Sequence, residues 1–198
     1  MSEVTELSRS CVITGAASGI GRATAVELAN RGWQVVAVDR DRTLLDELKV
    51  ANAGIHICPG DVTDVSLLEH AANLAERDGP LKGWVNNAAV FPQGRRLDEV
   101  AEDEILRSLQ INLVAVVHGC AIAARHMLAA GTAGSIVNVS SLQAMQVVRG
   151  CSIYATAKAG VEGLTRGTAV DYGPMGIRVN AVAPGTIATE RYEREMSS

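Results

Sequence analysis

Tyr154 and Lys158 stand four residues apart in the segment Ser-Ile-Tyr-Ala-Thr-Ala-Lys, and Ser141 precedes the tyrosine by thirteen residues. Residues i and i+4 share one face of a helix, so the lysine ammonium can lie beside the phenol. A free tyrosine has a pKa of about 10 and is a poor base at neutral pH. A neighbouring cation stabilises the phenolate and lowers that pKa, so this pair is suited to donating and accepting a proton.

On its own this spacing proves little, because a chain of this composition carries a tyrosine and a lysine four residues apart about one time in twenty by chance. In that case the tyrosine is an ordinary helix residue and the lysine is solvated. Other segments of the sequence must therefore decide whether the pair does chemistry.

A glycine-rich segment near the N-terminus supplies a second candidate site. The β-branched run 10–14 leads directly into Gly15-Ala-Ala-Ser-Gly19-Ile-Gly21, and a helical pattern follows. Glycines let the backbone approach a ligand closely, and the N–H groups that begin a helix bind phosphate. The spacing G-x-x-x-G-x-G differs from the commoner G-x-G-x-x-G. The segment predicts a phosphate-binding turn, with a tight turn that holds no ligand as the alternative.

An acidic residue follows the second expected strand. Asp39 ends the run 34–38, eighteen residues after Gly21. In dinucleotide-binding folds a carboxylate at this place accepts hydrogen bonds from the adenosine ribose and repels a 2′-phosphate. This favours NAD over NADP, although Arg40 and Arg42 leave NADP open because guanidinium groups bind phosphate. A solvated, helix-capping charge run is the alternative interpretation.

Taken together, these residues resemble the short-chain dehydrogenase/reductase family over nearly the whole chain. Residues 14–21 are similar to its glycine signature, Asp61-Val62 to its adenine-contacting pair, and Asn86-Asn87-Ala88-Ala89 to its Asn-Asn-Ala-Gly element, with alanine as the last residue. The resemblance implies four catalytic residues, namely Asn112, Ser141, Tyr154 and Lys158. It also implies a cofactor site made of Gly15, Ser18, Gly19, Ile20, Gly21, Asp39, Arg40, Asp61, Val62, Asn87, Ala88, Tyr154, Lys158, Pro184, Gly185, Ile187 and Thr189.

The resemblance also implies a role for each catalytic residue. Tyr154 would exchange a proton with the substrate oxygen while a hydride moves between nicotinamide and the carbinol carbon. Lys158 would lower the pKa of the tyrosine and bind the nicotinamide ribose. Ser141 would hold the substrate oxygen, and Asn112 would anchor a water that passes the proton toward solvent.

Alternating segments predict an α/β fold with a doubly wound, Rossmann-like parallel sheet. Strands are expected near 10–14, 34–38, 55–58, 82–86, 134–139 and 177–182, and helices near 19–31, 41–51, 64–77, 98–129 (with a break) and 153–172. The cofactor residues then follow strand ends, where such sheets bind ligands. We expect one domain, residues 1–198, in which residues 186–198 begin a substrate loop that ends early.

The resemblance implies a further helix and a last strand after the Pro-Gly segment, and the sequence stops at Ser198, so the chain is either naturally short or incomplete. We therefore expect the strand at 177–182 to be left as an edge and the substrate lid to be incomplete. Cofactor binding is the safer expectation. A non-catalytic NAD(H)-binding sensor or assembly protein remains an alternative to an alcohol dehydrogenase or ketoreductase.

Composition narrows the choice of partners. The net charge is −4 and no basic block occurs, so neither nucleic acid nor an anionic membrane is expected as a partner. No unbroken apolar run is long enough to span a bilayer, and the polar first residues leave no room for a signal peptide. Four scattered cysteines indicate buried thiols in the cytoplasm. The histidines lack the spacing of metal ligands, so no metal site is predicted. A homo-oligomer, either a tetramer or a dimer, is expected.

The substrate is the least constrained feature. The pocket wall is expected to come from residues 142–148, Cys151 and the region of Val90 and Phe91. These residues are mostly apolar or neutral, and Arg149 is the one basic residue near them. A neutral secondary alcohol or ketone is expected, while steroids, cyclic diols, sugar alcohols and acyl thioesters all remain open.

Overall fold

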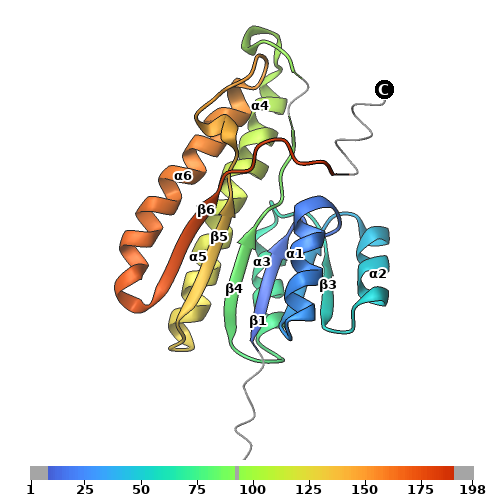
Figure 1. Cartoon of the computed structure of the whole chain (residues 1–198). Helices are drawn as coiled ribbons and strands as arrows, with labels where there is room; N and C mark the ends of the chain where they lie inside the picture. Colours follow the sequence, from blue (N-terminus) through green and yellow to red (C-terminus); the bar gives the residue numbers. More distant parts are fainter. Residues whose placement is uncertain (1–8, 92–93, 190–198) are drawn as a thin grey trace, which may run out of the picture.

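A computed structural model of the chain describes residues 9–91 and 94–189. Within them six strands form one parallel sheet (Figure 1): β1 (Ser10–Thr14), β2 (Gln34–Asp39), β3 (Ile55–Pro59), β4 (Leu81–Asn86), β5 (Gly134–Val139) and β6 (Ile177–Val182). The strand order is β3-β2-β1-β4-β5-β6. The doubly wound parallel sheet expected from the sequence is confirmed, and each expected strand agrees to within one residue at either end.

The order of the strands reverses between β1 and β4. The chain runs outward from β1 to β2 and β3, then returns to place β4 on the other side of β1. Sheets of this kind open a crevice at the carboxyl ends of the strands where the order reverses. Thr14, Asp39 and Asn86, which end β1, β2 and β4, therefore share the edge of the sheet at which a ligand would bind.

The helices are α1 (Gly19–Asn30), α2 (Arg42–Ala51), α3 (Val65–Ala75), α4 (Glu102–Leu109), α5 (Ala115–Ala129) and α6 (Ser152–Tyr172). The break expected within 98–129 is a π-helical turn, Gln110–Val114, between α4 and α5. Asp41 and Asp64 precede α2 and α3, and each side chain accepts a hydrogen bond from a main-chain N–H of the first turn. Such capping fixes where these helices begin.

Alternate residues of the strands point into two separate cores. Val12 and Val36 pack with α3, α5 and α6 on one face of the sheet, whereas Ile13 and Val35 pack with α1 and α2 on the other. This follows from the two-residue period of a strand. Burial on both faces explains why the central strands read as continuous apolar runs.

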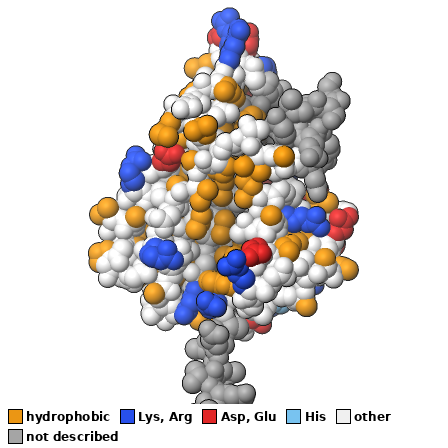
Figure 2. All heavy atoms as spheres, viewed as in Figure 1, with side chains coloured by type: hydrophobic (Ala, Val, Ile, Leu, Met, Phe, Trp, Pro, Cys, Tyr) orange, Lys and Arg blue, Asp and Glu red, His pale blue; other side chains and the backbone are white. Residues whose placement is uncertain are grey.

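One part of the sheet has no helix over it among the described residues. On the side of α1 and α2, the strands β4, β5 and β6 lie open (Figure 1), and Figure 2 shows hydrophobic side chains gathered in the middle of that side. Val182 of β6 is 52% exposed. β6 forms an outer edge of the described sheet, as the sequence indicated. Residues 190–198, expected to belong to a substrate loop, lie outside the described residues.

The segment Glu102–Ala129 is one continuous helical stretch of 28 residues, long and apolar enough by length and composition to cross a membrane. The sequence analysis predicted no membrane span because no unbroken apolar run is long enough, and Gln110, Asn112 and His118 interrupt this stretch. Val116 and Ile122 are buried in the core that α5 forms with β4 and α3. Apolar side chains of this stretch thus pack against the sheet.

The four cysteines, Cys11, Cys58, Cys120 and Cys151, are free and buried, as the sequence predicted. Burial raises the pKa of Cys11 to about 12 and the pKa of Cys120 to about 11. These thiols are therefore protonated at neutral pH and behave as small apolar side chains.

Candidate active site

The turn between β1 and α1 touches the chain that leaves β4. A Cβ atom on Gly21 would lie 2.1 Å from the carbonyl oxygen of Gly15, and one on Gly15 would lie 2.7 Å from Cα of Ala88. Gly15 and Gly19 also adopt the positive φ angles +66° and +53°. Only glycine meets both demands, so these positions are fixed by backbone geometry.

Asn87 ties the end of β4 to this turn. Its side-chain amide donates to the carbonyl oxygens of Thr14 (3.1 Å) and Gly15 (2.9 Å). The Thr14 hydroxyl oxygen accepts from the main-chain N–H groups of Asn87 (3.1 Å) and Ala88 (3.2 Å). The glycine turn is thus held rigidly above the point where the strand order reverses.

Asp39 is fixed against the same turn. One carboxylate oxygen accepts from the N–H of Ala17 at 3.0 Å and the other from the N–H of Asp41 at 3.1 Å. Ser18 begins α1 without a side-chain capping bond. The start of α1 therefore offers main-chain donors suited to phosphate, and a carboxylate stands beside it at the end of β2.

A small cavity of about 80 Å³ brings together six of the expected cofactor residues. Its lining is Gly15, Asp39, Arg40, Gly60, Asp61, Val62, Ala88, Ala89, Val90 and Ile111. The N–H of Thr63 hydrogen-bonds Asp61 and holds the pKa of that carboxyl below its ordinary value. Sequence reasoning missed Gly60 and Ile111 as lining residues. Ile111 immediately precedes Asn112 and could have been found from that position.

Tyr154 and Lys158 lie together on the inner side of α6. Tyr154 is 6% and Lys158 1% exposed, and the ammonium nitrogen lies 5.6 Å from the centre of the tyrosine ring. That nitrogen donates to the carbonyl oxygen of Val139, at the end of β5, at 2.7 Å. Burial lowers the pKa of Lys158 to about 8, because a low dielectric disfavours the charged form. The pair expected from spacing is thus brought to the carboxyl end of the sheet.

Ser141 follows β5 and lies thirteen residues before Tyr154. Its hydroxyl oxygen accepts from the N–H of Gln143 at 3.2 Å, which shapes the turn between β5 and α6. Ser140, its neighbour, is instead buried and donates to the carboxylate of Glu162 on α6 at 3.1 Å. The spacing that selects Ser141 over Ser140 as the catalytic serine agrees with this difference in environment.

Asn112 occupies the π-helical turn and is fully buried. Its side chain accepts from the N–H of Val90 and donates to the carbonyl oxygen of Val90, both at 3.0 Å, and it also donates to Ser108. This amide therefore holds the segment that leaves β4 in place. The expected role of Asn112 in anchoring a water stays a prediction, and its side chain is bonded to Val90 and Ser108.

A buried chain of hydrogen bonds supports the site from below. Trp84 donates to Asn86, Asn86 to Asn138, and Asn138 to Thr165 of α6, at 2.8, 2.8 and 2.9 Å. A Cβ on Gly119 would lie 2.1 Å from the Asn86 oxygen, so only glycine lets α5 pack this closely. The network locks α5 and α6 onto β4 and β5 beneath the strand ends.

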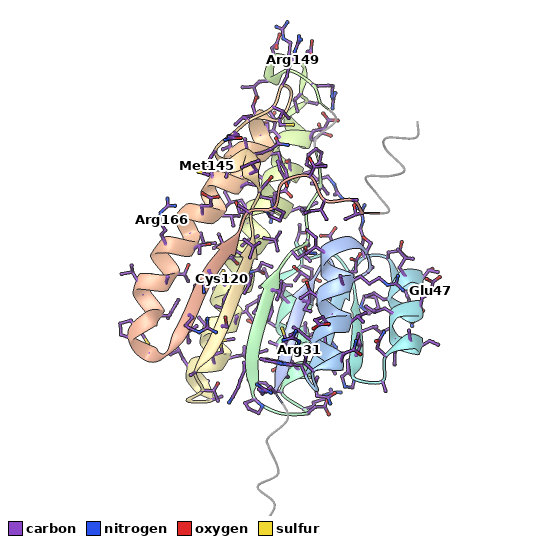
Figure 3. All side chains as sticks on the ribbon, in the orientation of Figure 1. Arg31, Glu47, Cys120, Met145, Arg149 and Arg166 are labelled. Carbon is purple, nitrogen blue, oxygen red and sulfur yellow. The ribbon has the colours of Figure 1, made fainter. Side chains whose placement is uncertain are left out.

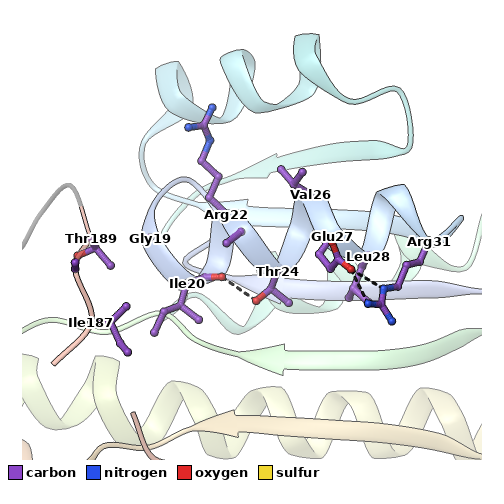
Figure 4. Close-up of a pocket in the computed structure, with 12 residues that line it drawn as sticks. Gly19, Ile20, Arg22, Thr24, Val26, Glu27, Leu28, Arg31, Ile187 and Thr189 are labelled. Carbon is purple, nitrogen blue, oxygen red and sulfur yellow. Dashed lines mark hydrogen bonds and ion pairs between the residues drawn. The ribbon is translucent and has the colours of Figure 1, made fainter. Parts of the chain in front are cut away.

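The segment after β6 approaches both α1 and the turn after β5. The N–H of Leu142 donates to the carbonyl oxygen of Pro184 at 2.9 Å. A wide, open hollow of about 910 Å³ lies between α1 and residues 187–189 (Figure 4). It brings Ile187 and Thr189 to Gly19 and Ile20, but its lining includes none of the four expected catalytic residues. Four of its lining residues, Gly19, Ile20, Ile187 and Thr189, are expected cofactor residues, and the others run along α1 as far as Arg31.

The loop between β5 and α6 carries little charge near the strand ends. Leu142 and Met145 are 40% and 73% exposed, and Arg149 extends from the tip of the molecule (Figure 3). The catalytic and cofactor residues expected from the sequence are thus collected at the carboxyl edge of the sheet, with an apolar loop above them.

Comparison with known proteins places the chain among enzymes of one type. The model of the short chain dehydrogenase family matches residues 9–197. D-erythrulose reductase of Gallus gallus is 37% identical over 182 residues, which cover 92% of this chain and 72% of that protein. L-xylulose reductase of Homo sapiens is 39% identical over 181 residues, covering 91% and 72%. A crystal structure of levodione reductase superimposes with a TM-score of 0.89 at 36% identity, covering 96% of this chain and 76% of that one.

Replacement of Lys158 by methionine should stabilise the fold at neutral pH. Burying the ammonium costs more than its hydrogen bond to Val139 returns, so the free energy of unfolding at pH 7 is expected to rise by about 2 kcal/mol. The folded pKa of about 8 lies below the ordinary 10.5, so the unfolded chain binds more protons between these values. Wild-type stability therefore rises through that range, and the advantage of the variant shrinks.

Urea unfolding at pH 7 and pH 10 measures this difference. Lys49→Met, on the exposed side of α2, is the control and should show no such pH-dependent gain. A Lys158→Met variant whose stability relative to wild type is lower at pH 7 than at pH 10 would contradict the expectation.

Proposed function

The chain belongs to the short-chain dehydrogenase family, and on that premise we propose that it interconverts neutral ketones and secondary alcohols with NAD as its preferred cofactor. Family membership and the relatives establish an NAD(P)-dependent oxidoreductase that acts on a small alcohol or ketone. We propose in addition a preference for NAD, a role for each catalytic residue and a neutral class of substrate.

The observation that carries the proposal is the buried pair on α6. A bound nicotinamide cofactor supplies or accepts the hydride. In reduction, Tyr154 donates its phenolic proton to the carbonyl oxygen, which becomes the hydroxyl of the alcohol, and the reverse transfer accompanies oxidation. Lys158, held at 2.7 Å from the carbonyl oxygen of Val139, lies close enough to stabilise the phenolate left on Tyr154. Ser141 donates to the substrate oxygen and holds it for the transfer.

The proton must also be exchanged with solvent. The side chain of Asn112 is occupied by Val90 and Ser108, so the water expected at this residue would be held by its main chain. A π-helical turn leaves main-chain groups with altered partners, which supports this assignment.

The residues present fit a dinucleotide. Gly15 and Gly21 let the β1–α1 turn close against Ala88 and Asn87, where no Cβ would fit, and main-chain N–H groups at the start of α1 suit phosphate. Asp39 supports the preference for NAD, because its carboxylate is fixed by Ala17 and Asp41 beside the same cradle and would repel a 2′-phosphate. Arg40 lines the adjoining cavity and is the feature that would favour NADP.

A neutral substrate agrees with the surroundings of Tyr154. The exposed side chains of Leu142 and Met145 are apolar, and the charge of Arg149 lies at the tip of the molecule (Figure 3). The expectation that Arg149 is the one basic residue near the pocket was wrong, because Arg95 and Arg107 line the cavity beside Phe91. Arg95 is paired with Glu104, which leaves less positive charge for an anionic substrate. The relatives are named for the reduction of D-erythrulose, L-xylulose and levodione, which supports carbonyl reduction as the reaction.

We further propose a cytoplasmic homo-oligomer, either a dimer or a tetramer, with no nucleic-acid or membrane partner. Exposed apolar side chains on the outer helices, such as Leu106, Val117 and Val170, support a contact between copies. The buried thiols and the net charge of −4 support the location and the partners. Light scattering that finds only a monomer would contradict the oligomer.

Replacement of Tyr154 by phenylalanine tests the reaction. Removing the proton donor is expected to lower kcat by about 10²–10⁴-fold. Binding of NADH, measured by nicotinamide fluorescence, should survive because the dinucleotide cradle is intact. Tyr172→Phe, in the last turn of the same helix, is the matched control and should retain turnover. Unchanged turnover in Tyr154→Phe would exclude the proposed mechanism and favour a cofactor-binding sensor.

Replacement of Asp39 by alanine tests the cofactor preference. Losing hydrogen bonds to a charged acceptor should weaken NADH binding about tenfold, while NADPH binding improves because the repulsion is gone. Titrating both cofactors against Asp39→Ala and against Asp46→Ala, an exposed carboxylate on α2, measures the effect. Equal loss of affinity for NADH and NADPH in Asp39→Ala would show that this carboxylate does not set the preference.

A further inference from the structure

Phe91 lies directly against the proposed proton donor. The ring centres of Phe91 and Tyr154 are 4.9 Å apart, and the rings are tilted by 53°. Tyr154 is 6% exposed, whereas Phe91 keeps 46% of its surface open. One side of the Phe91 ring therefore covers the phenol, and the rest forms an apolar surface beside the atom that would exchange the proton.

The main chain that carries Phe91 is held in place. Val90, the preceding residue, makes two hydrogen bonds of 3.0 Å with the buried side chain of Asn112. A Cβ on Gly150 would lie 2.4 Å from the carbonyl carbon of Gly94, so the loop after β4 touches the loop before α6. The main chain at Phe91 is thus fixed before a substrate binds. A preformed pocket wall adds selectivity without the loss of entropy that ordering a mobile side chain on binding would bring.

A cavity of about 240 Å³ adjoins Phe91, lined also by Gly150, Ser152 and Ile153 at the start of α6. Apolar side chains continue on the other loop, where Leu142 and Met145 are exposed. The same cavity is also lined by Arg95, Glu104, Arg107 and Ser108, so its wall is mixed. Its apolar part is formed by Phe91 and Ile153 together with Val90, Leu97 and Val100, and Phe91 supplies one flat aromatic face beside Tyr154.

Several polar groups of this cavity are already committed to protein partners, since Arg95 pairs with Glu104 and Ser108 accepts from Asn112. Ser141 is assigned to the reacting oxygen, and the side-chain oxygen of Gln143 is buried without a partner among the described residues. An open-chain polyol would bring a hydroxyl on each carbon, and every hydroxyl buried without a partner costs binding energy. A ring of CH₂ groups loses nothing by the same transfer and gains by leaving water.

We infer that Phe91 determines substrate specificity, favouring alicyclic ketones and alcohols with few hydroxyl groups over open-chain polyols. This inference rests on the proposed function, because it assumes that Tyr154 exchanges the proton. Phe91 itself takes no part in the chemistry. It selects the substrate by the apolar, flat surface that it presents to the ring.

Steady-state reduction by NADH measures this selectivity with cyclohexanone, 2-hexanone and 1,3-dihydroxyacetone. The wild type should give the highest kcat/KM with cyclohexanone and the lowest with dihydroxyacetone. In Phe91→Ala the KM for cyclohexanone should rise about tenfold, since the contact of a hydrophobic pocket with its substrate is lost. The kcat should change less than threefold, because the reacting groups are unchanged.

Two further variants distinguish the effect of the flat aromatic face from the effects of side-chain volume and of protein stability. Phe91→Leu keeps an apolar side chain without the aromatic face and should recover affinity for 2-hexanone better than for cyclohexanone. Val50→Ala removes an exposed apolar side chain on α2, outside this cavity, and should leave the ratio of the two ketones unchanged. Nicotinamide fluorescence should show equal NADH binding in all three variants.

A wild type that prefers dihydroxyacetone, or a Phe91→Ala variant with an unchanged ratio of kcat/KM for cyclohexanone and dihydroxyacetone, would overturn the inference. A wild type that binds NADH and reduces none of the ketones would contradict the proposed function instead. In that case saturation-transfer NMR with cyclohexanol and glycerol decides the inference on binding alone. Saturation of cyclohexanol that disappears in Phe91→Ala would support it, and equal saturation of both alcohols would overturn it.

Discussion

The close approach of the β1–α1 turn to the end of β4 is the constraint on which the site depends. No side chain fits at Gly21, where a Cβ would lie 2.1 Å from the Gly15 oxygen, and Asn87 closes the contact with two hydrogen bonds to the turn. Once these backbones touch, the start of α1, the carboxylate of Asp39 and the end of β4 must face the same crevice. β5 and β6 extend the same carboxyl edge of the sheet beyond β4. The start of α6, which carries Tyr154, lies at that edge, since Lys158 one turn later reaches the end of β5.

The chemistry proposed for this edge is expected to reduce the stability of the fold. Lys158 is an ammonium group buried to 1% exposure, with its pKa lowered to about 8, in a position where an apolar side chain would pack more favourably. The hydrogen-bonded chain from Trp84 through Asn86 and Asn138 to Thr165 shows the opposite case. There the buried polar groups are hydrogen-bonded to one another and fasten α5 and α6, the second of which carries Tyr154 and Lys158.

The pattern of apolar residues and the residues that end each run were enough to predict the sheet. The strands are short β-branched runs bounded by glycine or by helix-capping residues. The glycine turn, Asp39 and the Tyr154–Lys158 pair were visible because each is local in sequence. The bonds of Asn112 to Val90 and the contact of Phe91 with Tyr154 were not, because they join segments that only the folded sheet brings together. Gly60 and Ile111 were missed as cavity residues for the same reason. The apolar character of Glu102–Ala129 was not visible as a single run, because polar residues interrupt it.

The central claim is that the contact between the glycine turn and β4 creates a dinucleotide site. Calorimetric titration with NADH of the wild type, Gly21→Ala and Gly167→Ala tests it most directly, with circular dichroism to establish that each variant is folded. A Cβ on Gly167 meets nothing within 4 Å, so this variant is the matched control on α6. The expected result is one-to-one binding by the wild type and Gly167→Ala, and none by folded Gly21→Ala. Folded wild type that binds no NADH, or folded Gly21→Ala that binds it as tightly as wild type, would contradict the account.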